Sequence, residues 1–117
     1  MIYEPFDIVS VHFPFSDKKQ AKKRPALVIS SDRFFGPKIN HTVLLMITAT
    51  KNKPWPLDIE IKNLKETGLA KSSIIRMKSF TLDNRIIIEK IGTLATIDQK
   101  KVCHNFVQLF KEVFDKI

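Results

Sequence analysis

Hydrophobic positions change their spacing along the chain, and the spacing predicts a series of short strands followed by one helix. Alternating or continuous apolar runs bounded by Pro, Gly, Asn and Asp are typical of strands. They predict strands over residues 7–13, 25–30, 42–50, 57–62, 72–78 and 85–91. The segment 31–37 ends in Gly36-Pro37, a pair that terminates helices, and it predicts a turn or a single helical turn.

Two of these runs differ in their pattern. The run TVLLMITAT at 42–50 is apolar and β-branched, which predicts a central strand buried on both faces. The segment 57–62 alternates instead and predicts a half-exposed strand. Asp58 and Glu60 share one face of that strand, and we expect both carboxylates to be solvated.

The chain changes to a helical pattern after residue 95. Thr96 and Gln99 have the spacing of a capping box, in which the two side chains satisfy each other's free backbone amides. Apolar residues then recur every three or four positions, as in an amphipathic helix of about five turns: Val102, Cys103, Phe106, Phe110, Val113, Phe114 and Ile117. Cys103 lies on this face, so we expect a buried structural thiol there.

The order of the elements defines the fold class. Five to seven short strands and one terminal helix predict a mainly β (β+α) fold, a small curled antiparallel sheet or barrel with a C-terminal helix packed on it. With 117 residues, the chain has the length of a single domain over 1–117. One cysteine excludes an intrachain disulfide and suits a reducing compartment. No signal peptide or membrane span is recognisable, so we expect a cytoplasmic protein without a membrane partner.

The charge is basic and unevenly distributed. The net charge is +8, yet residues 1–17 hold three acids and no Lys or Arg, whereas residues 18–24 hold five bases. Such a cluster attracts a polyanion, either nucleic acid or an acidic protein segment. A solvated loop that only keeps the protein soluble is the alternative.

Side chains that usually bind metals or cofactors are scattered. The three histidines fall in different predicted elements: His12, His41 and His104. No glycine precedes Gly36, so no phosphate-binding glycine loop is present, and we expect neither metal nor cofactor. The remaining candidates are Arg24, whose backbone is restricted by Pro25, and Thr48 in the buried run. Taken singly, each also fits an ordinary structural role.

An ordered series of motifs resembles the MazF/PemK toxins of bacterial toxin–antitoxin pairs. It runs from about residue 6 to the C-terminus and comprises FPFSD (13–17), a basic loop, KRPALVIS (23–30), LLMITA (44–49), GLAKSSIIRMK (68–78), FTLD (80–83) and IGTL (91–94). The resemblance implies an SH3-like barrel with a C-terminal helix, which is usually a homodimer. The basic first loop is more similar to the PemK-like branch.

The resemblance also implies an activity and a partner. It implies a metal-independent endoribonuclease that cuts single-stranded RNA at short sequence motifs, through attack of the ribose 2′-hydroxyl on the adjacent phosphate. The products are a 2′,3′-cyclic phosphate and a 5′-hydroxyl. A cognate antitoxin with an acidic tail would cover the basic groove.

The residues that the resemblance assigns to this chemistry lie within the quoted motifs. Arg24 and Thr48 match the central catalytic pair, which stabilises the phosphorane and moves protons. Arg76 matches an arginine that some members use as well. The basic loop would form an electrostatic rim for RNA: Lys18, Lys19, Lys22 and Lys23.

Two features leave alternatives open. Members that use the second arginine often carry an aspartate two residues later, but Lys78 stands there, and His12 is one substitute base. A non-catalytic nucleic-acid-binding module of the same fold is therefore the alternative function. A peptide-binding SH3 domain fits worst, because its first loop would be acidic and rich in tyrosine. Trp55, between two prolines, either stacks on an unpaired base or caps an open end of the barrel.

Overall fold

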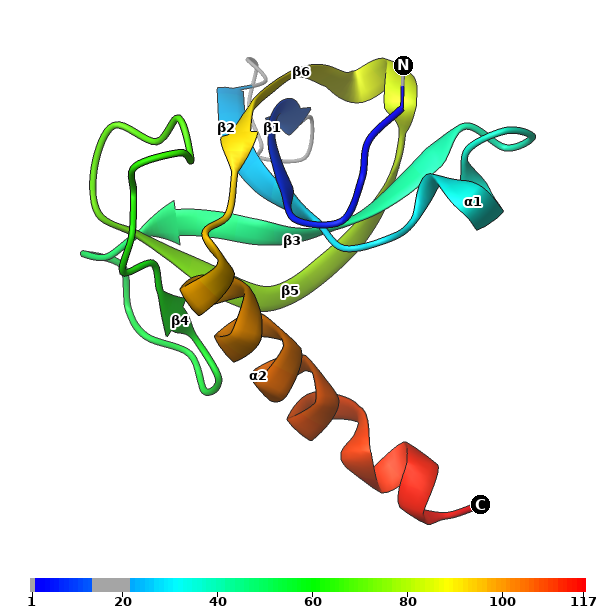
Figure 1. The fold of residues 1–117 in the computed structure, drawn as a ribbon, viewed down its shortest axis with the longest axis vertical. Helices are drawn as coiled ribbons and strands as arrows, with labels where there is room; N and C mark the ends of the chain where they lie inside the picture. The colour runs from blue at the N-terminus through cyan, green and yellow to red at the C-terminus, as the bar shows by residue number, and fades with distance from the viewer. Residues whose placement is uncertain (1, 14–21) are drawn as a thin grey trace.

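The computed structural model describes residues 2–13 and 22–117. Its elements, shown in Figure 1, are β1 (Asp7–Phe13), β2 (Lys22–Val28), α1 (Asp32–Phe35), β3 (His41–Ala49), β4 (Ile59–Glu60), β5 (Ser73–Asp83), a 3-10 turn η1 (Asn84–Ile86), β6 (Ile87–Thr93) and α2 (Thr96–Asp115). Every predicted strand and the single helical turn are present. The fold is mainly β, as the sequence pattern predicts.

The six strands form one antiparallel sheet in the order β4-β5-β3-β2-β1-β6. The run 42–50 does become a central strand, because β3 lies between β2 and β5. Three predicted strands differ in length. β2 begins at Lys22 rather than at Pro25 and ends at Val28, so Arg24 lies within the strand and not in the loop before it. β5 is longer than its predicted strand, because it pairs along the whole length of β3 from Ala49 to His41. β4 is shorter, because Leu57 adopts a positive φ of 69° that ends the extended backbone.

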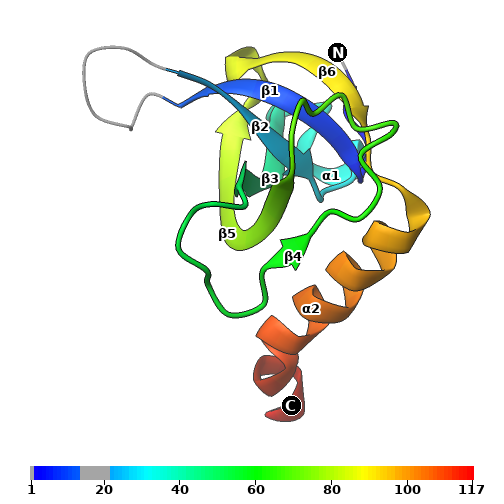
Figure 2. The ribbon, with the colours of Figure 1, turned by 90° about the vertical axis from the view of Figure 1, so that its left-hand side faces the viewer.

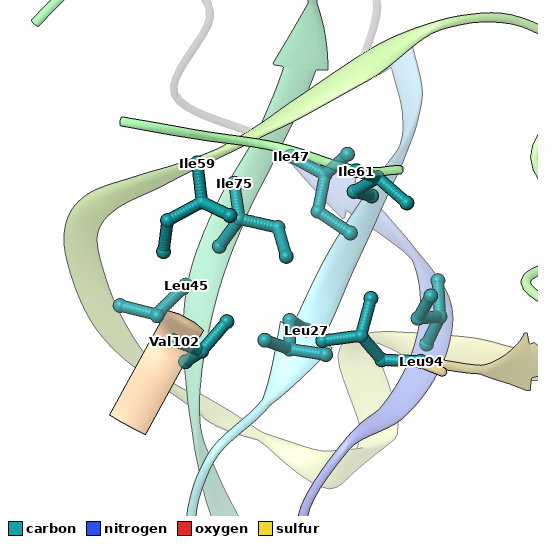
Figure 3. Packing of buried hydrophobic residues seen from close by; sticks show 9 residues of the cluster. Leu27, Leu45, Ile47, Ile59, Ile61, Ile75, Leu94 and Val102 are labelled. Atoms are coloured by element: carbon teal, nitrogen blue, oxygen red, sulfur yellow. The ribbon is translucent and has the colours of Figure 1, made fainter. Parts of the chain in front are cut away.

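The core consists of two clusters on opposite faces of the curled sheet. Neighbouring residues of one strand belong to different clusters, as Ile8 and Val9 do in β1 and Leu44 and Leu45 in β3. This follows from the alternation of side chains along a strand. Figure 3 shows the cluster that β1, β2, β3, β5 and the first turns of α2 share, with Leu27, Leu45 and Val102 inside it.

The segment 61–72 connects the two edges of the sheet. It leaves β4, rises past the strands in Figure 2, and returns to β5. Against β6, the backbone N–H of Thr93 donates to the carbonyl of Glu66 over 2.8 Å. Gly68 has φ +75°, and a Cβ there would lie only 2.1 Å from the carbonyl oxygen of Ile91. The close approach therefore requires glycine at this position.

A buried carboxylate fixes the same segment to α2. Asp98 is fully buried and accepts hydrogen bonds of 3.0 Å from the backbone N–H groups of Lys62 and Asn63. The predicted capping box is wrong, because Ala95 is the N-cap and makes no side-chain cap bond. Gln99 instead donates its side-chain amide to the carbonyl of Leu94. The polar side chains in the first turn of α2 therefore bond to neighbouring segments and do not cap the helix.

The packing of α2 is more limited than its pattern predicts. Of its residues only Asp98 and Val102 are buried, and Cys103 is exposed, so the expectation of a buried thiol is wrong. Most of the remaining apolar side chains of α2 are exposed: Ile97, Val107, Leu109, Phe110, Val113 and Phe114. Figure 1 shows why, because the C-terminal half of α2 extends away from every strand.

Candidate active site

A basic groove opens where the ends of β2 and β3 meet the segment 61–72. Its volume is about 580 Å³. It is lined by Ser10, Lys22, Lys23, Arg24, Pro25, Ile47, Thr48, Ala49, Lys51, Asn52, Gly68, Leu69, Ala70, Lys71, Ser73 and Ile91. Five of these described lining residues are Lys or Arg and none is Asp or Glu. The groove therefore presents an uncompensated positive charge that suits a polyanion.

The sheet register brings Arg24 and Thr48 together in this groove. Ala26 of β2 pairs with Met46 of β3. Continuing the antiparallel register by two residues places Arg24 opposite Thr48, so both side chains project from the same face. Both residues are half-buried. The pair named from the sequence thus lies at one site.

Thr48 has a partner that the sequence does not announce. Asn52 donates its side-chain amide to the Thr48 hydroxyl oxygen over 2.6 Å. The backbone turns back here, because the N–H of Asn52 also donates to the carbonyl of Ala49. A polar residue four positions after a threonine is too common a pattern to signal this contact. Lys51 and Lys71 also line the groove and were not predicted.

Arg76 does not line the groove and belongs to a separate cluster. It is 7% exposed, and its guanidinium donates to both carboxylate oxygens of Asp58, over 3.1 and 2.9 Å. It also donates to the carbonyl of Lys53 over 2.8 Å and lies 4.9 Å from the centre of the Trp55 ring. The expectation that Asp58 is solvated is therefore wrong. The alternation of 57–62 misled here, because it does not show that Asp58 faces a buried arginine of β5.

The Asp58 carboxyl is a stabilised anion. Burial alone would raise its pKa, but hydrogen bonds from Arg76 and from the backbone of Trp55, with the charge of Arg76, outweigh burial and lower it. The hydrogen bond to Asp58 in turn raises the pKa of Arg76. The two side chains are therefore both charged around neutral pH and form a closed ion pair.

The other sequence candidates lie at the rim or elsewhere. Lys22 and Lys23 are exposed at the start of β2 and line the groove, whereas Lys18 and Lys19 lie outside the described residues. His12 is exposed on β1 and does not line the groove. Within residues 2–13 and 22–117, no three His, Cys, Asp or Glu side chains gather as ligands for a metal ion. No helix in the described part of the chain is long and apolar enough to span a membrane.

Comparison with known families settles the relationship of the chain. The family of PemK-like, MazF-like toxins of type II toxin–antitoxin systems matches residues 4–110. The chain belongs to this family. The family membership confirms the resemblance drawn from the motifs of β1 to β6.

Solved structures of MazF toxins share the fold. The MazF of Deinococcus radiodurans superposes with a TM-score of 0.73 at 19% identity, covering 95% of this chain and 98% of that one. Toxin MazF-mt6 of Mycobacterium tuberculosis gives 0.69 at 16% identity over 90% and 96%. An endoribonuclease in complex with its cognate antitoxin, from a mycobacterial species, gives 0.69 at 9% identity over 92% and 91%. At these identities the likeness shows the MazF-like fold alone. No curated protein sequence matches the chain.

The ion pair in this MazF-like toxin predicts a pH-dependent stability. The folded-state pKa of Asp58 lies below its unfolded value of about 3.9, so its contribution is present above that pH and is lost as the pH falls through the folded pKa. Asp58→Asn should lower the free energy of unfolding by about 1–3 kcal/mol at pH 7. The difference from wild type should shrink toward pH 3. Denaturant unfolding of both proteins at the two pH values measures it, and an unchanged difference would contradict the assignment.

Proposed function

We propose that this MazF-like toxin is a metal-independent endoribonuclease that cleaves single-stranded RNA at short sequence motifs. The observation that carries the proposal is the juxtaposition of Arg24 and Thr48 in a groove whose described lining has five cations and no carboxylate. A solved structure of the same fold is described as an endoribonuclease in complex with its cognate antitoxin, which supports the same class of activity. We propose that it acts in the cytoplasm, on cellular RNA.

In the proposed reaction the substrate supplies the nucleophile. The ribose 2′-oxygen attacks the adjacent phosphorus, the bond from phosphorus to the 5′-oxygen breaks, and the products are a 2′,3′-cyclic phosphate and a 5′-hydroxyl. Arg24 holds the non-bridging oxygens with its guanidinium fork and donates a hydrogen bond to the departing 5′-oxygen, which takes its proton from water. Thr48 donates its hydroxyl hydrogen to the same phosphate. The 2′ proton goes to solvent, because the described lining has no carboxylate or imidazole.

Substitution of this pair tests the mechanism. With labelled single-stranded RNA in excess EDTA, Arg24→Ala and Thr48→Ala should each lower kcat/KM by about 10²–10³-fold, as expected for loss of one donor to the transition state. Arg24→Lys keeps the charge but not the fork, and should recover only part of the activity. Intact RNA from the wild type across several sequences, or cleavage only with added Mg²⁺, would refute the proposal.

A non-catalytic nucleic-acid-binding module is the second candidate. The observation in its favour is the absence of any Asp, Glu or His from the described lining of the groove, which leaves no conventional general base beside the phosphate. In the same assay, RNA that binds with a steep salt dependence but stays intact would favour this function over cleavage.

We also propose that Asn52 orients the Thr48 hydroxyl for this reaction. A hydroxyl has one hydrogen and two lone pairs, and Asn52 donates into a lone pair of Thr48. The hydroxyl hydrogen is therefore left free to point at the phosphate. Because the 2.6 Å bond also fixes the rotamer, Asn52 acts as a positioning residue.

The direction of this hydrogen bond can be tested. Asn52→Asp offers only acceptors, so it should draw the Thr48 hydrogen away from the phosphate and lower kcat more than Asn52→Ala does. In the Thr48→Ala background Asn52→Ala should have no further effect, because the residue that it orients is gone. Multiplicative losses in the double variant would instead show that Asn52 acts independently of Thr48.

Two partners follow from two different surfaces. We propose that an acidic antitoxin segment covers the groove, whose cations it complements. We propose that a second copy of the chain covers the apolar face of α2, so that the protein is a homodimer. That face repeats every three to four residues like a helix-packing seam. Its flanking charges are balanced between Lys111, Glu112, Asp115 and Lys116, which suits self-association rather than an acidic partner.

Sedimentation with a crossed pair of variants separates these surfaces. Phe110→Glu should convert the dimer into a monomer but leave binding of polyglutamate, a stand-in for the acidic segment, unchanged. Lys22→Ala with Lys71→Ala should weaken polyglutamate binding and leave the dimer intact. Phe34→Glu, on the exposed α1, is the matched control for added charge. A monomeric wild type, or polyglutamate binding insensitive to the lysines, would refute the respective assignment.

A further inference from the structure

Trp55 is an exposed aromatic side chain that does not serve the core. It belongs to neither buried cluster and is 43% exposed, so it does not cap an open end of the sheet. Of the two alternatives drawn from the sequence, base stacking is the one that this exposure permits.

The Trp55 ring is held in place from below. Its backbone N–H donates to the Asp58 carboxylate over 2.9 Å, and the Arg76 guanidinium lies 4.9 Å from the ring centre. Arg76 is itself fixed by Asp58 and by the carbonyl of Lys53. Pro54 and Pro56 restrict the backbone on either side. A ring that is already ordered loses little conformational entropy when a flat ligand stacks on it.

The charges around the ring favour a nucleotide over an apolar ligand. Asp58 neutralises Arg76, so this arginine is not free to bind a phosphate. Lys78 is exposed and its ammonium nitrogen lies 5.9 Å from the ring centre. An exposed aromatic face beside a cation that has no described carboxylate partner is the combination that binds an unpaired base and its phosphate.

Trp55, with Arg76 and Asp58 beneath its ring, forms a platform that lies close to the groove along the chain. Asn52, which lines the groove and contacts Thr48, precedes Trp55 by three residues. Three residues of extended chain span at most about 10 Å. A single-stranded RNA with one phosphate at Arg24 and Thr48 can therefore place a neighbouring base on Trp55.

We propose that Trp55 is a stacking subsite for an unpaired base of the bound RNA, and that Arg76 is the positioning residue beneath it rather than a phosphate ligand. This inference rests on the proposed function, because it needs single-stranded RNA in the groove. It assigns the two arginines different roles. Arg24 faces the substrate, whereas Arg76 and Asp58 hold the platform.

Intrinsic fluorescence reports on this subsite directly, because Trp55 is the only tryptophan of the chain. The probe is a short RNA with 2′-O-methyl groups, which cannot be cleaved because the nucleophile is blocked. Saturating RNA should quench the fluorescence of Trp55. Trp55→Ala should weaken binding by about 5–150-fold, the range expected for loss of one stacked base, with an unchanged salt dependence. Trp55→Phe should recover part of the affinity, and Lys78→Ala should reduce the salt slope.

The role of Arg76 is tested by Arg76→Lys, which keeps a charge beside Asp58 and removes the planar group under the ring. A positioning residue should lose RNA affinity in the wild-type background and lose nothing more in the Trp55→Ala background. A phosphate ligand should instead show the same loss in both backgrounds, which would overturn the proposed role.

The failures of the two proposals are distinguishable. Unquenched fluorescence and a Trp55→Ala variant that binds like the wild type would overturn the stacking subsite, while cleavage that depends on Arg24 would leave the proposed function standing. Fluorescence that changes with protein concentration and not with RNA would assign Trp55 to self-association and would also overturn the subsite. If wild-type protein binds no RNA at all, both proposals fail.

Discussion

The pairing of β3 with β2 on one side and β5 on the other is the constraint on which the rest of the structure depends. The β2–β3 register brings Arg24 and Thr48 to the same face, and the β3–β5 register sets Arg76 beside Met46. Because a strand's side chains alternate, a shift of one residue would turn Thr48 into the core and expose Ile47. Buried side chains in both clusters oppose such a shift. The core therefore fixes the site as well as the fold.

The distribution of carboxylates explains how a groove whose described charged residues are all cations can exist in a chain with twelve acids. The two buried acids of the described chain are engaged elsewhere. Asp7 accepts from the backbone of Glu4 and pairs with Lys90, and Asp98 accepts from two backbone amides of the segment 61–72. Asp98 thereby also positions the wall of the groove at 68–71. Acids that hold backbone and arginine in place cannot compensate the groove, and its charge remains available to a polyanion.

The sequence carries local information well and long-range contacts poorly. The strands, the α1 turn and α2 follow from periodicity, and the proximity of Arg24 and Thr48 follows from motifs that resemble a known family. The contact between Asp58 and Arg76 joins the loop before β4 to a residue of β5 eighteen positions later, and no local pattern encodes it. Asn52 was missed because its partner depends on how the chain turns after Ala49. For α2 the apolar periodicity predicts the helix correctly but overestimates its packing, because the described chain leaves most of its apolar face exposed.

The position of Asp58 also changes how the departure at Lys78 is understood. The aspartate that is missing two residues after Arg76 has no counterpart in β5, yet a carboxylate reaches Arg76 from the loop before β4. An arginine stays protonated whatever its surroundings, so its chemistry depends on whether its charge is already paired. Arg24 forms no ion pair with a described carboxylate, whereas Arg76 is paired with both carboxylate oxygens of Asp58. The same residue type is therefore available for substrate at one position and structural at the other, and the difference arises from a single aspartate.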